Sequence, residues 1–164
     1  MFRTLILIFS LIFTIATAQS RGKNLILITM DGLRWQEIFY GVDSLLIQNT
    51  DFVEDSDALQ NRFWAKTVAE RREKLMPFFW RNISQNGQLY GNHDKGSKVF
   101  LVNKEWFSYP GYNEILTGYA DPEVKSNDKI WNKNVTFLEF LNGQRPYAGR
   151  VAAFCSWDVF PYIV

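Results

Sequence analysis

Residues 24–32 have the sequence Asn-Leu-Ile-Leu-Ile-Thr-Met-Asp-Gly, an apolar run that ends in a carboxylate and a glycine. A short run rich in leucine and isoleucine, without polar alternation, is typical of a strand that is buried on both faces of a sheet. Gly32 permits the turn that takes the chain off the end of such a strand. This segment therefore predicts a buried strand over residues 24–30.

Two later segments have a similar apolar composition, and helical segments separate the three. Residues 99–102 and 151–155 are the second and third strand candidates. Strands that alternate with helices imply an α/β architecture, in which a mainly parallel sheet is flanked by helices. Apolar spacing, proline and glycine place the helices at residues 35–40, 59–75, 77–86, 110–117 and 135–142, the last capped by Asn134.

The first 18 residues have the layout of a secretory signal peptide. Arg3 precedes an apolar run at residues 5–15, and Ala-Thr-Ala at 16–18 fits a small-x-small cleavage site. The run is shorter than the roughly 20 apolar residues of a spanning helix, which disfavours the alternative of an uncleaved membrane anchor. We therefore expect an exported protein, periplasmic or secreted, whose mature chain starts at Gln19.

The charge balance argues against a nucleic-acid-binding protein, and the cysteine content excludes a fold held by internal disulfides. The 18 Lys and Arg residues become 17 when Arg3 is removed, against 17 Asp and Glu, so the mature chain is neutral. Binding to a nucleic acid needs a clustered positive surface, which nothing in the sequence indicates. The single cysteine, Cys155, excludes an internal disulfide, and we expect a buried thiol because it ends an apolar segment.

The last nine residues, 156–164, are apolar and aromatic up to the end of the chain. A domain seldom stops within such a segment, so we expect residues 19–164 to be the N-terminal part of a larger domain, truncated at its C-terminus. Trp157 and Asp158 follow the third strand candidate. They are candidates for a substrate pocket, although core packing is the favoured interpretation for Trp157.

Asp31 is the first residue with a candidate chemical role. In open α/β sheets, ligands bind beyond the carboxyl ends of the strands, which is the place that Asp31 would occupy. A carboxylate there is a hard oxygen ligand suited to a divalent cation. The alternative is a turn aspartate that bonds to its own backbone ahead of Gly32, and the spacing does not separate the two.

Ser108 lies in the sequence Phe-Ser-Tyr-Pro-Gly-Tyr-Asn-Glu-Ile-Leu-Thr-Gly, residues 107–118. A hydroxyl just before a helix that starts at Pro110 faces the helix N-terminus, where free N–H groups and the helix dipole favour an anion. That setting suits a nucleophile that attacks a phosphorus or sulfur centre, and metal coordination is one way to activate it. The alternative is a serine that only caps the helix.

Together the two segments resemble the alkaline phosphatase superfamily. The similarity is to its nucleotide pyrophosphatase/phosphodiesterase, sulfatase and phosphoglyceromutase-like branch, in secreted bacterial members. It rests on a strand that ends in Asp-Gly and on a hydroxyl residue that precedes an aromatic, a proline and a helix ending in Ile-Leu-Thr-Gly. The sequence Gly-Gln-Leu-Tyr-Gly-Asn at residues 87–92 is a further part of the resemblance. The resemblance covers nearly all of the mature chain, and the order of the motifs gives it its specificity.

The resemblance implies metal-dependent hydrolysis of a small-molecule phosphate or sulfate ester, with two divalent metal ions, usually zinc. Asp31 matches the first metal ligand, and Ser108 matches the residue that is both nucleophile and metal ligand. Asn127, 19 positions after Ser108, matches an asparagine that donates to a non-bridging oxygen and so stabilises transition-state charge. The alternative for Asn127 is a turn asparagine.

This chain departs from the family pattern in two ways. Ser108 follows Asp31 by 77 positions, more than in compact diesterases, which marks residues 41–75 as an insertion over the site. The family's other metal ligands are later Asp and His residues, whereas the only histidine here, His93, precedes Ser108 and fits a surface turn. We therefore expect this chain alone to be inactive. The alternative is a secreted non-catalytic binding protein or pseudoenzyme on the same fold.

Overall fold

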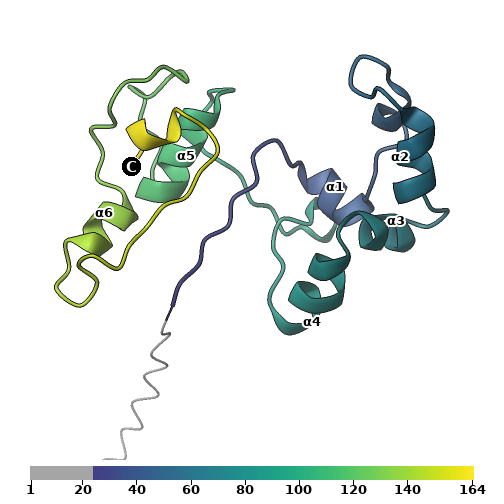
Figure 1. Cartoon of the computed structure of the whole chain (residues 1–164), viewed down its shortest axis with the longest axis horizontal. Helices are drawn as coiled ribbons and strands as arrows, with labels where there is room; N and C mark the ends of the chain where they lie inside the picture. The colour runs from purple at the N-terminus through teal and green to yellow at the C-terminus, as the bar shows by residue number, and fades with distance from the viewer. Residues whose placement is uncertain (1–23) are drawn as a thin grey trace, which may run out of the picture. The chain divides into compact units, whose positions relative to one another are not determined.

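The structure is a computed structural model, and it describes residues 24–164. The chain divides into two units, Met1–Met30 and Asp31–Val164. The second unit is built from helices, and none of the described residues belongs to a β-strand (Figure 1). The expected α/β architecture with a mainly parallel sheet is therefore wrong for this chain. The predicted signal peptide, residues 1–18, lies outside the described residues.

The three predicted strands are non-helical segments with exposed side chains. The exposed fractions of Leu25 and Ile28 are 79% and 78%, and that of Phe154 is 95%. An apolar run indicates that a segment favours burial, but a strand forms only when a second strand satisfies its backbone hydrogen bonds. Parallel pairing joins segments that are far apart in the sequence. Local composition therefore does not establish it.

The first group of helices follows the turn at Gly32. It consists of α1 (Trp35–Tyr40), the 3-10 turn η1 (Leu46–Gln48), α2 (Ser56–Phe63) and α3 (Val68–Leu75). Helix α3 contacts both α1 and α2. The bounds of α1 are as predicted, whereas the single helix predicted over residues 59–75 is two helices. The predicted insertion, residues 41–75, thus holds η1, α2 and α3.

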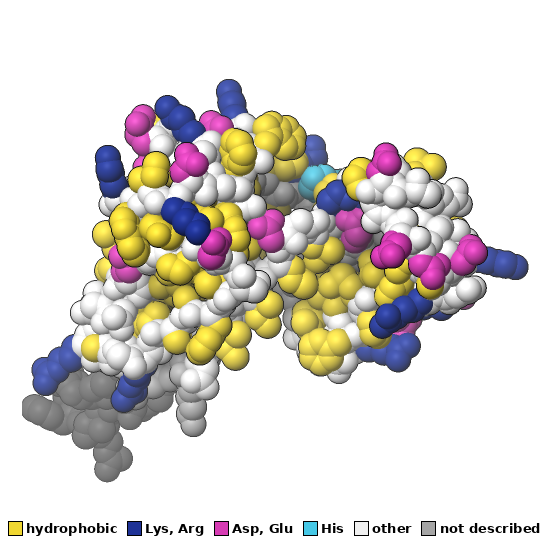
Figure 2. Space-filling model, turned by 45° about the horizontal axis from the view of Figure 1, so that its top comes forward, with side chains coloured by type: hydrophobic (Ala, Val, Ile, Leu, Met, Phe, Trp, Pro, Cys, Tyr) yellow, Lys and Arg dark blue, Asp and Glu magenta, His cyan; other side chains and the backbone are white. Residues whose placement is uncertain are grey.

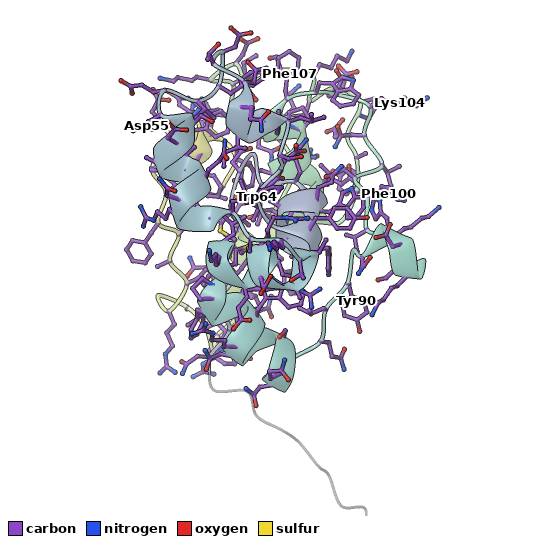
Figure 3. All side chains as sticks on the ribbon, turned by 90° about the vertical axis from the view of Figure 1, so that its right-hand side faces the viewer. Asp55, Trp64, Tyr90, Phe100, Lys104 and Phe107 are labelled. Atoms are coloured by element: carbon purple, nitrogen blue, oxygen red, sulfur yellow. The ribbon has the colours of Figure 1, made fainter. Side chains whose placement is uncertain are left out.

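Both helices begin at side-chain caps, and the cap of α3 together with one aromatic side chain marks the break between α2 and α3. Asp55 caps α2 by accepting a hydrogen bond from Ala58 N at 2.8 Å. Thr67 and Glu70 form a capping box at the start of α3, which satisfies two backbone N–H groups reciprocally. The ring of Trp64, labelled in Figure 3, lies in the break with the Arg71 guanidinium 4.7 Å from its centroid.

Gly41 allows α1 to approach α3 closely. Its φ of 78° lies in the left-handed region, which glycine adopts without a steric penalty. A Cβ atom at this position would lie 2.4 Å from the backbone of Arg71. Phe39, which is 6% exposed, packs edge-on against Trp80 at a centroid distance of 6.0 Å. Glycine at position 41 and these two rings therefore hold α1 in place.

The helix predicted after Pro77 is present and ends before Gly87. Its middle is the π-helical segment η2 (Phe79–Ile83), and its last turn is α4 (Ser84–Asn86). The indole N–H of Trp80, in η2, donates to the carbonyl of Ile38 in α1 at 3.1 Å. A further 3-10 turn, η3 (His93–Lys95), places the imidazole of His93 against the Trp35 ring, 4.5 Å between centroids.

The second group of helices contains the main apolar core. It consists of α5 (Ser108–Thr117), α6 (Phe137–Asn142) and the 3-10 turn η4 (Phe160–Tyr162), which lies beside α5 in Figure 1. The buried residues of this core are Tyr109, Leu116, Val159 and Ile163. The C-terminal apolar segment therefore packs on α5. Thr136 caps α6 in a capping box, so the prediction that Asn134 is the cap is wrong.

Hydrophobic side chains cover much of the face shown in Figure 2. Cys155 is also exposed, which corrects the expectation of a buried thiol. Within residues 24–164, no helix combines the length and the apolar character that a membrane crossing requires. The segments with the most exposed apolar side chains include the three that were predicted to be strands.

Candidate active site

Ser108 is the first residue of helix α5, and the connection that passes Phe100 and Lys104 leads into this helix at Phe107 (Figure 3). Phe107 takes the N-cap position with extended backbone angles, φ −124° and ψ 150°, and provides no side-chain cap. Phe107 therefore takes the N-cap position in place of Ser108. The alternative interpretation, in which Ser108 only caps the helix, is wrong. Its half-buried side chain lies instead in the first turn, where the helix dipole favours negative charge.

Asn127 contacts the same helix end. Its side-chain Oδ1 accepts a hydrogen bond from the backbone N–H of Tyr109, the residue after Ser108, at 2.9 Å. An asparagine amide also carries two donor hydrogens on Nδ2, which this contact leaves available. The structure therefore brings Ser108 and Asn127, two of the three predicted site residues, to the same turn.

Tyr109 fixes the helix start in the core. The residue is 3% exposed, and its phenol oxygen lies 2.8 Å from the carbonyl of Ile130 and 2.9 Å from that of Tyr162. Burial raises the pKa of the Tyr109 phenol above its ordinary value, so it stays protonated. One side chain thus joins α5 to the loop that carries Asn127 and to η4.

A network of asparagines holds the middle of α5. Asn113 is fully buried, and its Oδ1 accepts from the side-chain amides of Asn132 and Asn134, each at 3.1 Å. Asn134 also donates to the carboxylate of Asp121 at 2.7 Å. Because these buried polar groups are hydrogen-bonded, they fix the path of the loop between α5 and α6. Asn134 thus belongs to this network, and Thr136 is the N-cap of α6.

Glu114, the residue that follows Asn113 in α5, holds the segment that precedes the helix. Its carboxylate accepts from the backbone and side-chain amides of Asn103, at 2.9 and 2.8 Å, and from the backbone N–H of Val102. Desolvation by burial alone would raise the pKa of Glu114, but these donors outweigh it and hold that pKa below its ordinary value. The backbone at residues 102 and 103, which leads toward Ser108, is therefore held by a side chain of α5.

A salt bridge anchors the loop that carries Asn127 at a second point. The ammonium group of Lys129 donates to the carboxylate of Asp158, and this pairing lowers the pKa of Asp158. Both side chains are substantially exposed, so the pair contributes little to stability. Trp157 is half-buried and packs against the core beside Tyr112, as the core-packing interpretation predicted.

Asp31 lies in an exposed turn with Gly32, whose φ is 72°. The structure does not gather metal ligands around this carboxylate. Among residues 24–164, no three His, Cys, Asp or Glu side chains are placed to hold a metal ion. One carboxylate and one hydroxyl are fewer ligands than two zinc ions require, so the described residues do not fit that pair of ions.

Sequence patterns missed the residues that support the site. Tyr109, Asn113 and Glu114 were quoted in the Ser108 motif, but nothing in their spacing indicates which carbonyl or amide each one contacts. The density of asparagines at residues 127–134 was the one available signal, since amide side chains near a helix are often part of a buried network. No protein-family model, curated protein or solved structure matches this chain.

Proposed function

We propose that this chain is an exported protein that supplies the nucleophile and the anion-binding groups for metal-dependent hydrolysis of phosphate or sulfate esters. Ser108 is the nucleophile, and Asn127 is a donor to the anionic oxygen. The supporting observation is the 2.9 Å hydrogen bond from Tyr109 N to Asn127 Oδ1. This contact supports the proposal because it brings the Asn127 side chain to the helix turn that begins with Ser108, the hydroxyl suggested by the family resemblance.

The donors at this helix end can be counted from the sequence. Pro110 has no backbone N–H, and the N–H of Tyr109 is bonded to Asn127. The backbone N–H of Ser108 and the Nδ2 group of Asn127 therefore remain to bind an oxygen of the ester. Two preorganised donors at a helix N-terminus stabilise negative charge that develops during attack on phosphorus or sulfur.

A serine hydroxyl needs activation before it attacks, and the sequence has no histidine after Ser108 to act as its base. The enzymes that this chain resembles activate the hydroxyl with a divalent metal ion, and Ser108 would need the same activation from a metal site that the described residues do not complete. Asp31 is the proposed metal ligand. Because the described residues do not complete a metal site, we expect the chain itself to show no turnover.

Hydrolysis of an aryl phosphate, a bis-aryl phosphate and an aryl sulfate, measured with and without Zn²⁺, tests the proposal. Where the natural protein continues beyond Val164, that extended version is expected to hydrolyse at least one of them. Ser108→Ala should abolish this turnover, and Asn127→Ala should lower kcat about 10²- to 10³-fold. Asn86→Ala, an exposed change in α4, is the control and should leave kcat unchanged.

Two results would contradict the proposal in different ways. If the extended version with Ser108→Ala still hydrolyses an ester, Ser108 is not the nucleophile. Turnover by the chain itself that Ser108→Ala abolishes would confirm the nucleophile and refute the need for further metal ligands.

A second candidate function is non-catalytic binding by an exported protein. The observation that favours it is the exposed apolar side chains of residues 99–102, which suit contact with a partner. The two functions differ in the reading frame that follows Val164. In-frame Asp and His codons with metal-dependent turnover favour the hydrolase, whereas a stop codon and a stable exported product favour the binding protein.

A further inference from the structure

A pocket of about 350 Å³ lies between helix α3 and the helix that begins at Pro77. All of its lining residues come from one stretch of the chain, residues 69–85. They are Ala69, Arg72 and Glu73 of α3, Trp80 and Arg81 of η2, and Gln85 of α4. Binding sites for small molecules are concave, with volumes of about 300–1,000 Å³. The two helices therefore form a concavity of the size that a small molecule fills.

The π-helical turn shapes one wall of this pocket. Residues five apart lie on different faces of an α-helix, whereas the i→i+5 hydrogen bonds of a π-helix bring them to the same face. In η2 the backbone N–H of Ser84 bonds in this way to the carbonyl of Phe79. Trp80 and Gln85 are also five residues apart, and both line the pocket. Single π turns are frequent at functional sites, so this turn is an independent indication of a ligand.

The guanidinium group of Arg72 is held in place but has no acidic partner. It lies over the ring of Trp80, 3.8 Å from the centroid. No carboxylate in the part of the chain that the structure describes forms an ion pair with it. A guanidinium on an aromatic face keeps its N–H groups for an acceptor, and the contact with the ring reduces the side-chain freedom that binding costs. Arg72 therefore offers preorganised donors to a ligand.

Two other arginines lie over aromatic rings, and their surroundings differ from those of Arg72. Arg71 uses Nη1 to donate to the carbonyls of Ala65 and Lys66, at 3.1 and 3.2 Å. Arg62 lies 5.0 Å from the ring centroid of Phe63, on the exposed surface of α2 and outside the pocket. Arg72 thus combines the contact with a ring, available donors and a place in the pocket wall.

The charges of the pocket select the kind of ligand. Arg81 Nε pairs with a carboxylate oxygen of Glu73 at 2.6 Å, so the two arginines and one glutamate of the lining give a net charge of +1. A guanidinium and a carboxylate form two parallel hydrogen bonds. A phosphate group carries a charge of about −1.5 to −2 at neutral pH, and the carboxylate of Glu73 repels the additional charge.

We propose that this pocket binds a small molecule through a singly charged carboxylate group, which accepts hydrogen bonds from Arg72. The site shares no residue with the proposed hydrolytic site and does not depend on it.

Titration of the full isotope-labelled chain with sodium acetate, followed by NMR, tests the proposal. The Nε–H signal of Arg72 is identified as the one that is missing from the spectrum of Arg72→Lys. It should shift and saturate as acetate is added. Sodium chloride at the same ionic strength should leave it in place, and inorganic phosphate should bind more weakly than acetate at neutral pH.

Two variants locate the binding at this arginine. Arg72→Met keeps an unbranched side chain beside Trp80 but removes the donors. The loss of charged hydrogen bonds should weaken acetate binding about 10- to 100-fold, measured at the indole N–H signal of Trp80. Arg62→Met is the matched control, because it removes an arginine that lies over a ring outside the pocket. It should leave acetate binding unchanged.

Three results would overturn the proposal. The first is the absence of a saturable shift in the unmodified chain, which does not depend on the folding of any variant. The second is a response to phosphate or chloride as strong as the response to acetate. The third is binding to Arg72→Met that is as tight as binding to the unmodified chain.

Discussion

At the scale of single residues, Tyr109 joins more of the chain than any local pattern indicates. Its phenol lies within hydrogen-bonding distance of carbonyls at positions 130 and 162. Tyr109→Phe keeps the ring but removes its one O–H donor, while the carbonyl of Tyr162 still accepts from the backbone N–H of Asn132 at 2.8 Å. We therefore expect a loss of about 0.5–1.5 kcal/mol in unfolding free energy. Urea denaturation measures it. Tyr147→Phe, at an exposed tyrosine whose hydroxyl makes no hydrogen bond among the described residues, is the control and should change stability by less than about 0.5 kcal/mol.

The carboxylate of Glu114 makes stability depend on pH. Its pKa in the folded chain is below the ordinary value of 4.5, so the unfolded chain binds the proton more readily. The stabilisation is therefore complete above about pH 4.5 and is lost as pH falls through the lower, folded-state pKa. Glu114→Gln should destabilise most at neutral pH, and the difference from the unmodified chain should shrink in acid. Glu54→Gln, at an exposed glutamate, is the matched control.

At the scale of elements, α3 depends on its capping box. Thr67 Oγ1 accepts from Glu70 N at 3.2 Å, and the Glu70 carboxylate accepts from Thr67 N at 3.1 Å. Thr67→Ala removes the cap and should lower stability by about 1 kcal/mol. Thr50→Ala, at an exposed turn threonine, should have little effect in the same denaturation experiment. Equal effects of the two changes would contradict the role of the cap.

The elements differ in how far the sequence predicts them. The helix that begins at Pro77, helix α5 and helix α6 end where glycine was expected to end them, because proline and glycine act on the backbone locally. The break between α2 and α3 escaped prediction because apolar spacing continues across it. The predicted strands are wrong because a strand depends on a partner segment that its own residues do not specify.

The candidate site, too, could be predicted from the sequence only in part. Ser108 and Asn127 were selected from the sequence by the family resemblance, and the structure places both at the first turn of α5. The expected proximity of Asp31 was derived from the edge of a parallel sheet, and that reasoning does not apply without the sheet. Long-range contacts such as that of Asn127 with Tyr109 are not encoded in any local spacing.

At the scale of the whole molecule, the N-terminal segment predicts processing. The chain should be cleaved after Ala18 during export, because Ala-Thr-Ala at residues 16–18 follows an apolar run too short to remain as an anchor. Intact-mass measurement of the exported product should give a chain that starts at Gln19. Ala18→Arg should block cleavage, and Ser20→Ala should not. An exported product that still begins at Met1 would contradict the prediction.

The close approach of Gly41 to the Arg71 backbone has a consequence for genetic selection. Every side chain larger than hydrogen collides there with main-chain atoms, which cannot rotate away as a flexible side chain does. A saturation library at codon 41, sorted for soluble expression, should therefore return to glycine alone. Neighbouring exposed codons should retain broad diversity. The residues recovered at position 41 would thus show whether the first group of helices packs in the cell as it does in this structure.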